Sequence, residues 1–426
     1  MSTTLWIDDK TVAMTGERRH RHKGKPIAPG FSQPALAGTI TFGPTALAAA
    51  IARTATLRTA DPELLSHYRD SALSETRILV ADGNEFALTE HLTSLVDSER
   101  STFAGRVGAG ITDLYMNALG YVWRDNAACL ASSLKPHADF LYYGGPSSAH
   151  GVVLAEARGS FEAKASDSKM AYEAQRKYLR QVRPYIGAMS PHGQVIHGYA
   201  VAFGSRPTTT GAFLRISQTQ RPKVKASGNT CTPDDGSDNG VPAGVALASH
   251  RSNFILLDAL PIADWIDWLN GLRDLPDDRD PIAFIRFEYA GRRFLACADA
   301  LLPYHHPRFW FDDLFGLPFW RQRHLRLHSS DVSPLPCFVM EEDAATAFLN
   351  TLTRMIAAGS REASGLLELP RTEVAGFSLD GADRRSRIAR EDYDYALFGD
   401  GLALIAGKPP QRSAGVRIWH PKEGLH

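Results

Sequence analysis

The sequence lacks the features that mark secreted proteins, proteins with structural zinc sites and membrane-spanning proteins. Its 426 residues include four cysteines, which form neither a CxxC pair nor a short zinc spacing. Disulfides and structural zinc are therefore not expected. The N-terminal residues lack the apolar core of a secretion signal, and no run approaches ~18 consecutive apolar residues. These absences predict a cytoplasmic protein that does not associate with membranes.

An excess of charge of either sign is also missing. Lys plus Arg equals Asp plus Glu at 47 each, so any attraction to nucleic acid must come from a local basic face. The hydrophobic fraction of 44% and the charged fraction of 22% are typical of globular domains. Because single hydrophobic cores usually stop growing at about 250–300 residues, the chain length predicts more than one domain.

Apolar periodicity predicts an α/β fold. The recurrence of apolar residues between Val107 and Val122 predicts an amphipathic helix, and Asp113 lies away from its apolar stripe, so this carboxylate is expected to face solvent. Further helices are expected at residues 44–57, 62–73 and 168–182, and strands at residues 140–143, 152–158, 195–203 and 211–217. This order predicts a mixed sheet flanked by helices.

Composition divides the remaining chain. Residues 1–95 are expected to form an N-terminal extension, with a basic mobile arm at 16–38 and a hairpin at 78–88. Residues 96–222 would form the central α/β domain, residues 223–243 a linker, and residues 244–426 a second α+β domain of unknown role. In that second domain the pattern predicts a strand at 254–260, helices at 262–272 and 344–358, and hairpins that turn at Ala290-Gly291 and at 398–401.

The residues with a chemical pattern lie between His137 and Arg158. Asp139 opens one predicted strand, and Glu156 lies in the next. Because strand side chains alternate between faces, Glu156 and Arg158 are expected to share one face. A return through the glycine-rich turn at Gly144 would place Asp139 beside Glu156. Two neighbouring carboxylates are ligands of the kind that hold Mg²⁺.

This pattern resembles the core of the PD-(D/E)xK nuclease superfamily over about residues 100–220. The resemblance implies a restriction-endonuclease-like mixed sheet flanked by helices and a site for Mg²⁺ or Mn²⁺. Asp139 and Glu156 would bind the metal, with the carbonyl of Ala157 as a third ligand. Gln181 and Tyr185 also match the QxxxY motif of the RecB-like branch, although Pro184 between them should end the helix that carries them.

The sequence departs from the family where the second strand should carry a lysine, because Arg158 stands there. With a pKa above ~12 a guanidinium cannot accept a proton, but it can hold a phosphate. Lys164, in the later Glu162-Ala163-Lys164, and Lys177 are alternative lysines. The residues expected to line the path of a nucleic acid are Lys177, Arg180, Gln181 and Arg183.

Two functions remain open from the sequence. The first is a metal-dependent nuclease, or a degenerate relative, that hydrolyses DNA in preference to RNA, in prokaryotic antiphage defence. The second is a non-enzymatic, nuclease-like subunit that binds nucleic acid or a partner protein in a larger complex. The two differ in an observable property, since an active site should bind divalent metal and be stabilised by it.

Overall fold

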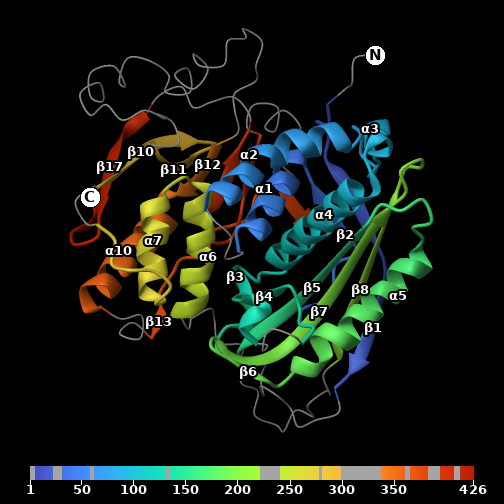
Figure 1. Ribbon diagram of the computed structural model, residues 1–426, viewed down its shortest axis with the longest axis horizontal. Coiled ribbons are helices and arrows are strands. Elements are labelled where there is room, and N and C mark those ends of the chain that lie inside the picture. Colours follow the sequence, from blue (N-terminus) through green and yellow to red (C-terminus); the bar gives the residue numbers. More distant parts are fainter. Residues whose placement is uncertain are drawn as a thin grey trace.

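The computed structural model describes residues 5–22, 31–57, 62–130, 135–220, 240–277, 281–298, 337–359, 365–381, 394–406 and 413–426. Within these residues the chain is a mixed α/β protein, as the sequence predicts. Two large sheets lie side by side, and helices pack against them (Figure 1). No helix in this part of the chain is both long and apolar enough to cross a lipid bilayer.

The larger sheet holds the predicted strands of the central region. Its strands lie in the order β14 (Phe377–Leu379), β2 (Thr39–Phe42), β1 (Lys10–Arg21), β8 (Ala212–Gln220), β7 (Gly193–Ser205), β5 (Val152–Ser160), β4 (Phe140–Tyr143) and β3 (Trp123–Asn126), and the short β6 (Met189–Ser190) pairs with β7. The pairs β1–β8 and β5–β7 are parallel. Strands β3, β4 and β5 form an antiparallel meander.

Helices pack on both faces of strand β5. Helix α4 (Asp97–Ala118) lies on one face, with α1 (Pro44–Ala55), α2 (Pro62–Leu79) and the short α3 (Glu90–Ser94) beyond it, and α5 (Asp167–Lys177) lies on the opposite side (Figure 1). Glycines let α4 approach the strand backbone. A Cβ atom at Gly159 would lie 1.6 Å from the carbonyl oxygen of Ala104, and one at Gly108 would lie 2.5 Å from the amide nitrogen of Gly159. The α4–β5 contact therefore tolerates no side chain at either glycine.

The prediction of a mobile arm at residues 16–38 is wrong for the first part of that segment. Residues Lys10–Arg21 form β1, which is paired on one side with β2 and on the other with β8. The backbone bonds of a sheet stabilise a polar strand that has little apolar periodicity. Side chains add to this, because Arg18 donates to Gln175 of α5 at 2.6 Å and His20 stacks on Tyr178. Residues 23–30 of the predicted arm lie outside the described residues.

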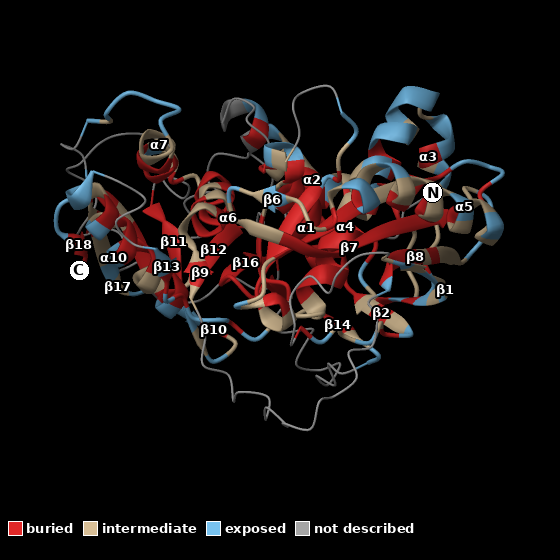
Figure 2. Cartoon of the chain, turned by 90° about the horizontal axis from the view of Figure 1, so that it is seen from below, coloured by how far each residue is buried: buried red, intermediate tan, exposed pale blue. Residues whose placement is uncertain are grey.

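The predicted boundaries at residue 95 and at residues 223–243 are not edges of the larger sheet. Strands β1 and β2 from the N-terminal region and β14 from the C-terminal region complete it. Buried residues continue from one sheet to the other (Figure 2), and one hydrophobic cluster holds both Trp6 and Trp419. Most of the predicted linker, residues 223–239, lies outside the described residues. The predicted hairpin at 78–88 is also wrong in its first part, because α2 continues to Leu79.

The second sheet is antiparallel in its described strands. They lie in the order β15 (Tyr395–Leu397), β16 (Leu402–Ile405), β12 (Cys337–Glu341), β11 (Arg292–Cys297), β10 (Ile282–Tyr289), β17 (Ser413–His420) and β18 (Gly424–Leu425), and β9 (Val241–Pro242) pairs separately with β13 (Leu366–Leu367). Both predicted hairpins, β10–β11 and β15–β16, are confirmed. The helices near this sheet are α6 (Ala243–Leu256), α7 (Leu260–Leu269) and α10 (Glu342–Ala358).

The predicted strand at 254–260 is wrong, because these residues end α6 and begin α7. Helix α6 is buried on most of its circumference. Its last residues, Phe254–Leu256, form an uninterrupted buried apolar run, and periodicity alone cannot distinguish such a run from a buried strand.

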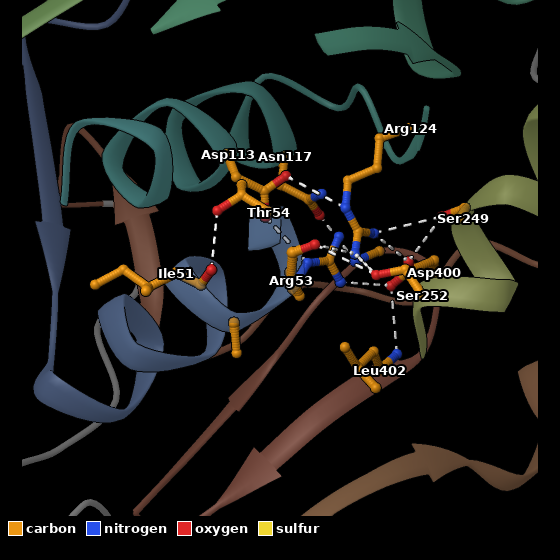
Figure 3. A network of polar contacts seen from close by, with 12 residues as sticks. Ile51, Arg53, Thr54, Asp113, Asn117, Arg124, Ser249, Ser252, Asp400 and Leu402 are labelled. Atoms are coloured by element: carbon orange, nitrogen blue, oxygen red, sulfur yellow. Dashed lines mark hydrogen bonds and ion pairs between the residues drawn. The ribbon is translucent and has the colours of Figure 1, made fainter. Parts of the chain in front are cut away.

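Four buried charges join α1, α4, β3 and the β15–β16 turn (Figure 3). Arg53 donates to Asp113 at 3.0 Å and to Asp400 at 2.9 Å, and Arg124 donates to Asp400 at 3.1 Å. All four side chains are fully buried. The prediction that Asp113 faces solvent is therefore wrong, because α1 covers the polar side of α4 and supplies Arg53 as the partner of this carboxylate.

Candidate functional site

Strand register brings the two predicted carboxylates together. Phe140 of β4 lies opposite Ala155 of β5, so one further step along the antiparallel pair places Asp139 opposite Glu156. The amide nitrogen of Ala157 donates to Oδ2 of Asp139 at 2.9 Å. Asp139 is exposed, whereas Glu156 is 1% exposed. The site thus has one carboxylate at the surface and the other beneath it.

Helix α5 places a lysine on the face of β5 that carries Glu156. The helix begins at a capping Ser166, whose hydroxyl accepts a hydrogen bond from the amide of Lys169 at 3.2 Å. At its last residue, Nζ of Lys177 lies 2.6 Å from Oε1 of Glu156. Of the alternative lysines, Lys177 is therefore the one that contacts an acid of the site.

Arg158 shares the face of Glu156, as the strand alternation predicts. Its Nε atom lies 3.8 Å from Oε2 of Glu173 on α5, and its side chain is 41% exposed. The guanidinium group of Arg158 therefore lies at the surface next to the site, where it can bind an anion without a change in the backbone of β5.

Gln181 and Tyr185, which match the QxxxY spacing, form hydrogen bonds to the main chain just before Asp139. Gln181 donates to the carbonyl of His137 at 2.8 Å and to Oε2 of Glu156 at 3.3 Å. Tyr185 donates to the carbonyl of Pro136 at 3.1 Å. They lie in a π-helical turn, Tyr178–Val182, and a 3-10 turn that contains Pro184, so the expected break of the α-helix is confirmed. Both side chains still reach the site.

Burial and a like charge act on Glu156. Burial, and next the negative charge of Asp139, raise the pKa of the Glu156 carboxyl to about 8, and Lys177 only partly opposes them. The Glu156 carboxyl is therefore largely protonated at neutral pH. A divalent cation at the same place would replace that proton and relieve the repulsion of the carboxylates.

Three other predicted residues, Lys164, Arg180 and Arg183, make no ion pair with Glu156 in the part of the chain that the structure describes. Lys164 is exposed in the turn after β5, past a strand end that is about 13 Å from Glu156 at ~3.3 Å per residue. Arg180 and Arg183 are exposed, and the charge of Arg183 acts on His20, whose pKa is lowered by burial and by Arg18 and Arg183. Lys177 therefore contacts the buried acid of the site, whereas Lys164 lies beyond the end of β5.

The main-chain carbonyls of Pro136 and His137 belong to the surroundings of the site and were not predicted. A side-chain pattern carries no signal for a main-chain acceptor. The glutamine and the tyrosine that bind them do show in the sequence, as a Gln-x-x-x-Tyr spacing.

Comparisons with protein-family models, with curated proteins and with solved structures found no match. The interpretation of the site therefore rests on its own geometry: two opposed carboxylates, one ammonium group and one carboxamide. Such a set can hold a divalent cation and can present a positive group beside it.

The raised pKa of Glu156 predicts that the affinity for any divalent cation placed at this site would depend on pH. In the metal-free protein this carboxyl, with its pKa of about 8, is largely protonated at pH 6 and must lose its proton to bind a cation. The affinity for Mg²⁺ or Mn²⁺ should thus rise by up to about tenfold per pH unit and level off above pH 8. Thermal unfolding with and without metal, from pH 6 to 8.5, would measure this. Glu156→Gln should remove the effect, and an equal metal shift at all pH values would contradict the prediction.

Proposed function

We propose that this chain is a metal-dependent nuclease with a site of the PD-(D/E)xK type. The observation that carries the proposal is the meeting of three side chains from separate elements. Asp139, directly before β4, is placed opposite Glu156 of β5 by the strand register, and Lys177 of α5 contacts the buried acid at 2.6 Å.

The order of elements around the site supports a restriction-endonuclease-like core. Helix α4 precedes the antiparallel meander β3–β4–β5, and α5 then connects β5 to the parallel strand β7. The two acids stand at the start of β4 and inside β5, and helices flank both faces of the sheet. This agrees with the arrangement that the sequence resemblance implies.

The donor set fits Mg²⁺ or Mn²⁺. Both ions favour oxygen ligands. Asp139 and Glu156 supply two neighbouring carboxyl groups, and the pKa of Glu156 is raised by burial and next by the charge of Asp139. The carbonyl of Ala157 is proposed as a third ligand, since the amide of this residue already contacts Asp139. When bound, such an ion polarises a phosphodiester and lowers the pKa of a coordinated water.

The side chains of the chain itself supply the remaining parts of the proposed site. Lys177 takes the place of the missing strand lysine, and its ammonium group would stabilise negative charge that develops at the scissile phosphate. Arg158 would hold a phosphate oxygen from the surface side of the same face. Gln181 orients Glu156 and fixes the chain before Asp139.

A nucleic acid is the proposed substrate, with DNA preferred to RNA as an expectation carried over from the sequence, because the charges near the site are those that contact a phosphate backbone. Arg180 and Arg183 are exposed at the end of the same helical segment as Lys177. Such contacts position a strand without reading its bases, so the proposal includes no sequence preference.

The test is an incubation of the purified full chain with linear, circular and single-stranded DNA and with RNA. Each substrate is offered with Mg²⁺, with Mn²⁺ and with EDTA. Cleavage that requires a divalent metal supports the proposal. Binding of DNA without cleavage under any of these conditions would instead support the non-enzymatic subunit.

Lys177 and Lys164 give a matched pair of variants. Lys177→Met is expected to lower the cleavage rate by about 10²–10³-fold, because it removes the positive charge next to the buried Glu156, beside the reacting phosphate. Lys164→Met removes an exposed lysine past the strand end and should leave the rate within about twofold, since its charge is screened by solvent. Initial rates at saturating metal would decide, and equal losses in both variants would argue against the role of Lys177.

A further inference from the structure

A second group of metal-ligating side chains lies at the β3 edge of the larger sheet. Asp125 is in β3, Cys129 is in the 3-10 turn that follows (Ala127–Leu130), and His192 is in the turn between β6 and β7. One ligand atom from each of the three lies within 4.8 Å of the other two. Carboxylate, thiol and imidazole together are a donor set that suits Zn²⁺.

The imidazole ring of His192 is held with one nitrogen toward this cluster. Its Nε2 atom lies 2.7 Å from Oδ2 of Asp125, and its amide donates to the hydroxyl of Ser190 at 3.1 Å. The other side of the ring fills space left by Gly244 of α6, where a Cβ atom would lie 2.6 Å from Nδ1. The ring therefore cannot turn freely away from Asp125.

The separations suit a tetrahedral ion. Zinc bonds of about 2.0–2.3 Å place neighbouring ligand atoms about 3.3–3.8 Å apart. The ligand atoms already lie within 4.8 Å of one another. Side-chain rotations that move them by about 1 Å bring them to the zinc spacing. The cysteine spacing in the sequence predicted no zinc site, because such spacings reveal only ligands that are close along the chain. His192 comes from a turn that is distant in the sequence from Asp125 and Cys129.

A Cys–His–Asp nucleophile arrangement fits the same residues less well. In such a relay the histidine contacts the acid through one nitrogen and the thiol through the other. Here Nε2 contacts Asp125, and Nδ1 faces Gly244.

We propose that Asp125, Cys129 and His192 form a zinc site, with the fourth coordination position taken by water or by a further ligand. The site would join the end of β3 to the β6–β7 turn. It lies next to the candidate nuclease site, because the amide of Ala127 donates to the carbonyl of Asp139 at 3.3 Å. It is nevertheless independent of cleavage, since it shares no side chain with Asp139, Glu156 or Lys177.

The experiment uses Co²⁺ as a spectroscopic substitute for zinc in the metal-free full chain. One equivalent should give visible bands of tetrahedral intensity and a sulfur-to-cobalt charge-transfer band, and Zn²⁺ should displace them. Cys129→Ser and His192→Gln should remove the charge-transfer band or weaken Co²⁺ binding by more than about tenfold. Asp125→Asn, which keeps the shape of the side chain, should weaken binding to a similar degree.

Two controls separate this site from the rest of the molecule. Cys337→Ala changes a buried cysteine of the second sheet, and Glu156→Gln removes the proposed nuclease ligand, so both should keep the cobalt spectrum. Thermal midpoints without metal identify any variant that fails to fold, and Asp125→Asn then provides the test. A wild-type protein without a charge-transfer band, or a band that persists in Cys129→Ser, overturns the proposal.

Discussion

Glu156→Gln is expected to reduce metal-dependent cleavage by on the order of a thousandfold or more. The substitution keeps the volume of a side chain that is 1% exposed but removes the charge that would bind the ion. Several kcal/mol of transition-state stabilisation depend on such an ion, and each ~1.4 kcal/mol corresponds to a tenfold change in rate. Initial cleavage rates of the purified variant, compared with wild type at saturating Mg²⁺ or Mn²⁺, measure the effect.

The chain contains its own control for this substitution. Glu162, in the literal acid-x-lysine Glu162-Ala163-Lys164, forms an exposed ion pair with Lys169. Glu162→Gln should therefore leave cleavage within about twofold, because exposed ion pairs contribute little. Asp139→Asn should reproduce the loss seen for Glu156. The metal-site assignment would be wrong if both folded variants, Glu156→Gln and Asp139→Asn, retained wild-type cleavage.

Folding of Glu156→Gln is expected to be preserved. The wild-type carboxyl has its pKa raised to about 8 by burial and by Asp139, so it is already largely neutral at pH 7. A neutral amide in its place therefore leaves the charge of this side chain nearly unchanged, and the contact with Lys177 is the interaction lost. Unfolding midpoints without metal should therefore differ little between the two proteins, which separates a catalytic defect from a folding defect.

The parts of the site that lie on strands could be predicted from the sequence. Strand alternation places Glu156 and Arg158 on one face, and the glycine-rich turn after β4 returns the chain so that Asp139 meets Glu156. These inferences need only local geometry, because the three residues belong to two strands that are neighbours in sequence and in space.

The partner of Glu156 could not be fixed in the same way. Whether Lys164 or Lys177 reaches the acid depends on where the strand ends and on how α5 crosses it, which are tertiary properties. The strand continues to Ser160, so Lys164 is carried past the site, while the last turn of α5 returns Lys177 to it. A residue count along the chain does not distinguish these outcomes.

The N-terminal strand and the buried charges were missed for a related reason. The arginines of β1 offer no apolar period, yet the strand gains its stability from backbone pairing with β2 and β8. Asp113 lies on the polar side of its own helix, which indicates solvent only if nothing else covers that side. Helix α1 does, and it carries Arg53. Amphipathic patterns describe one element and not its neighbours.

Asp400→Asn is expected to lower the free energy of unfolding by about 3–5 kcal/mol. Burial alone would raise the pKa of Asp400, but the positive charges of Arg53 and Arg124 outweigh burial and hold it well below its usual range. Removal of this one carboxylate leaves two buried guanidinium groups with Asp113 as their one remaining anionic partner among the described residues. Urea unfolding at neutral pH, with Asp97→Asn as an exposed control, measures the difference.

Two further measurements distinguish the charge network from simple loss of packing. Because the folded pKa of Asp400 is depressed, its stabilisation is present above the ordinary aspartate pKa of about 3.9 and is lost as the pH falls below it. The difference between wild type and Asp400→Asn should therefore shrink in acid. Combining Asp400→Asn with Arg124→Gln should cost less than the sum of the single changes, since the second change removes a charge that the first left unpaired. Strictly additive losses that do not vary with pH would show that Asp400 contributes packing and not charge.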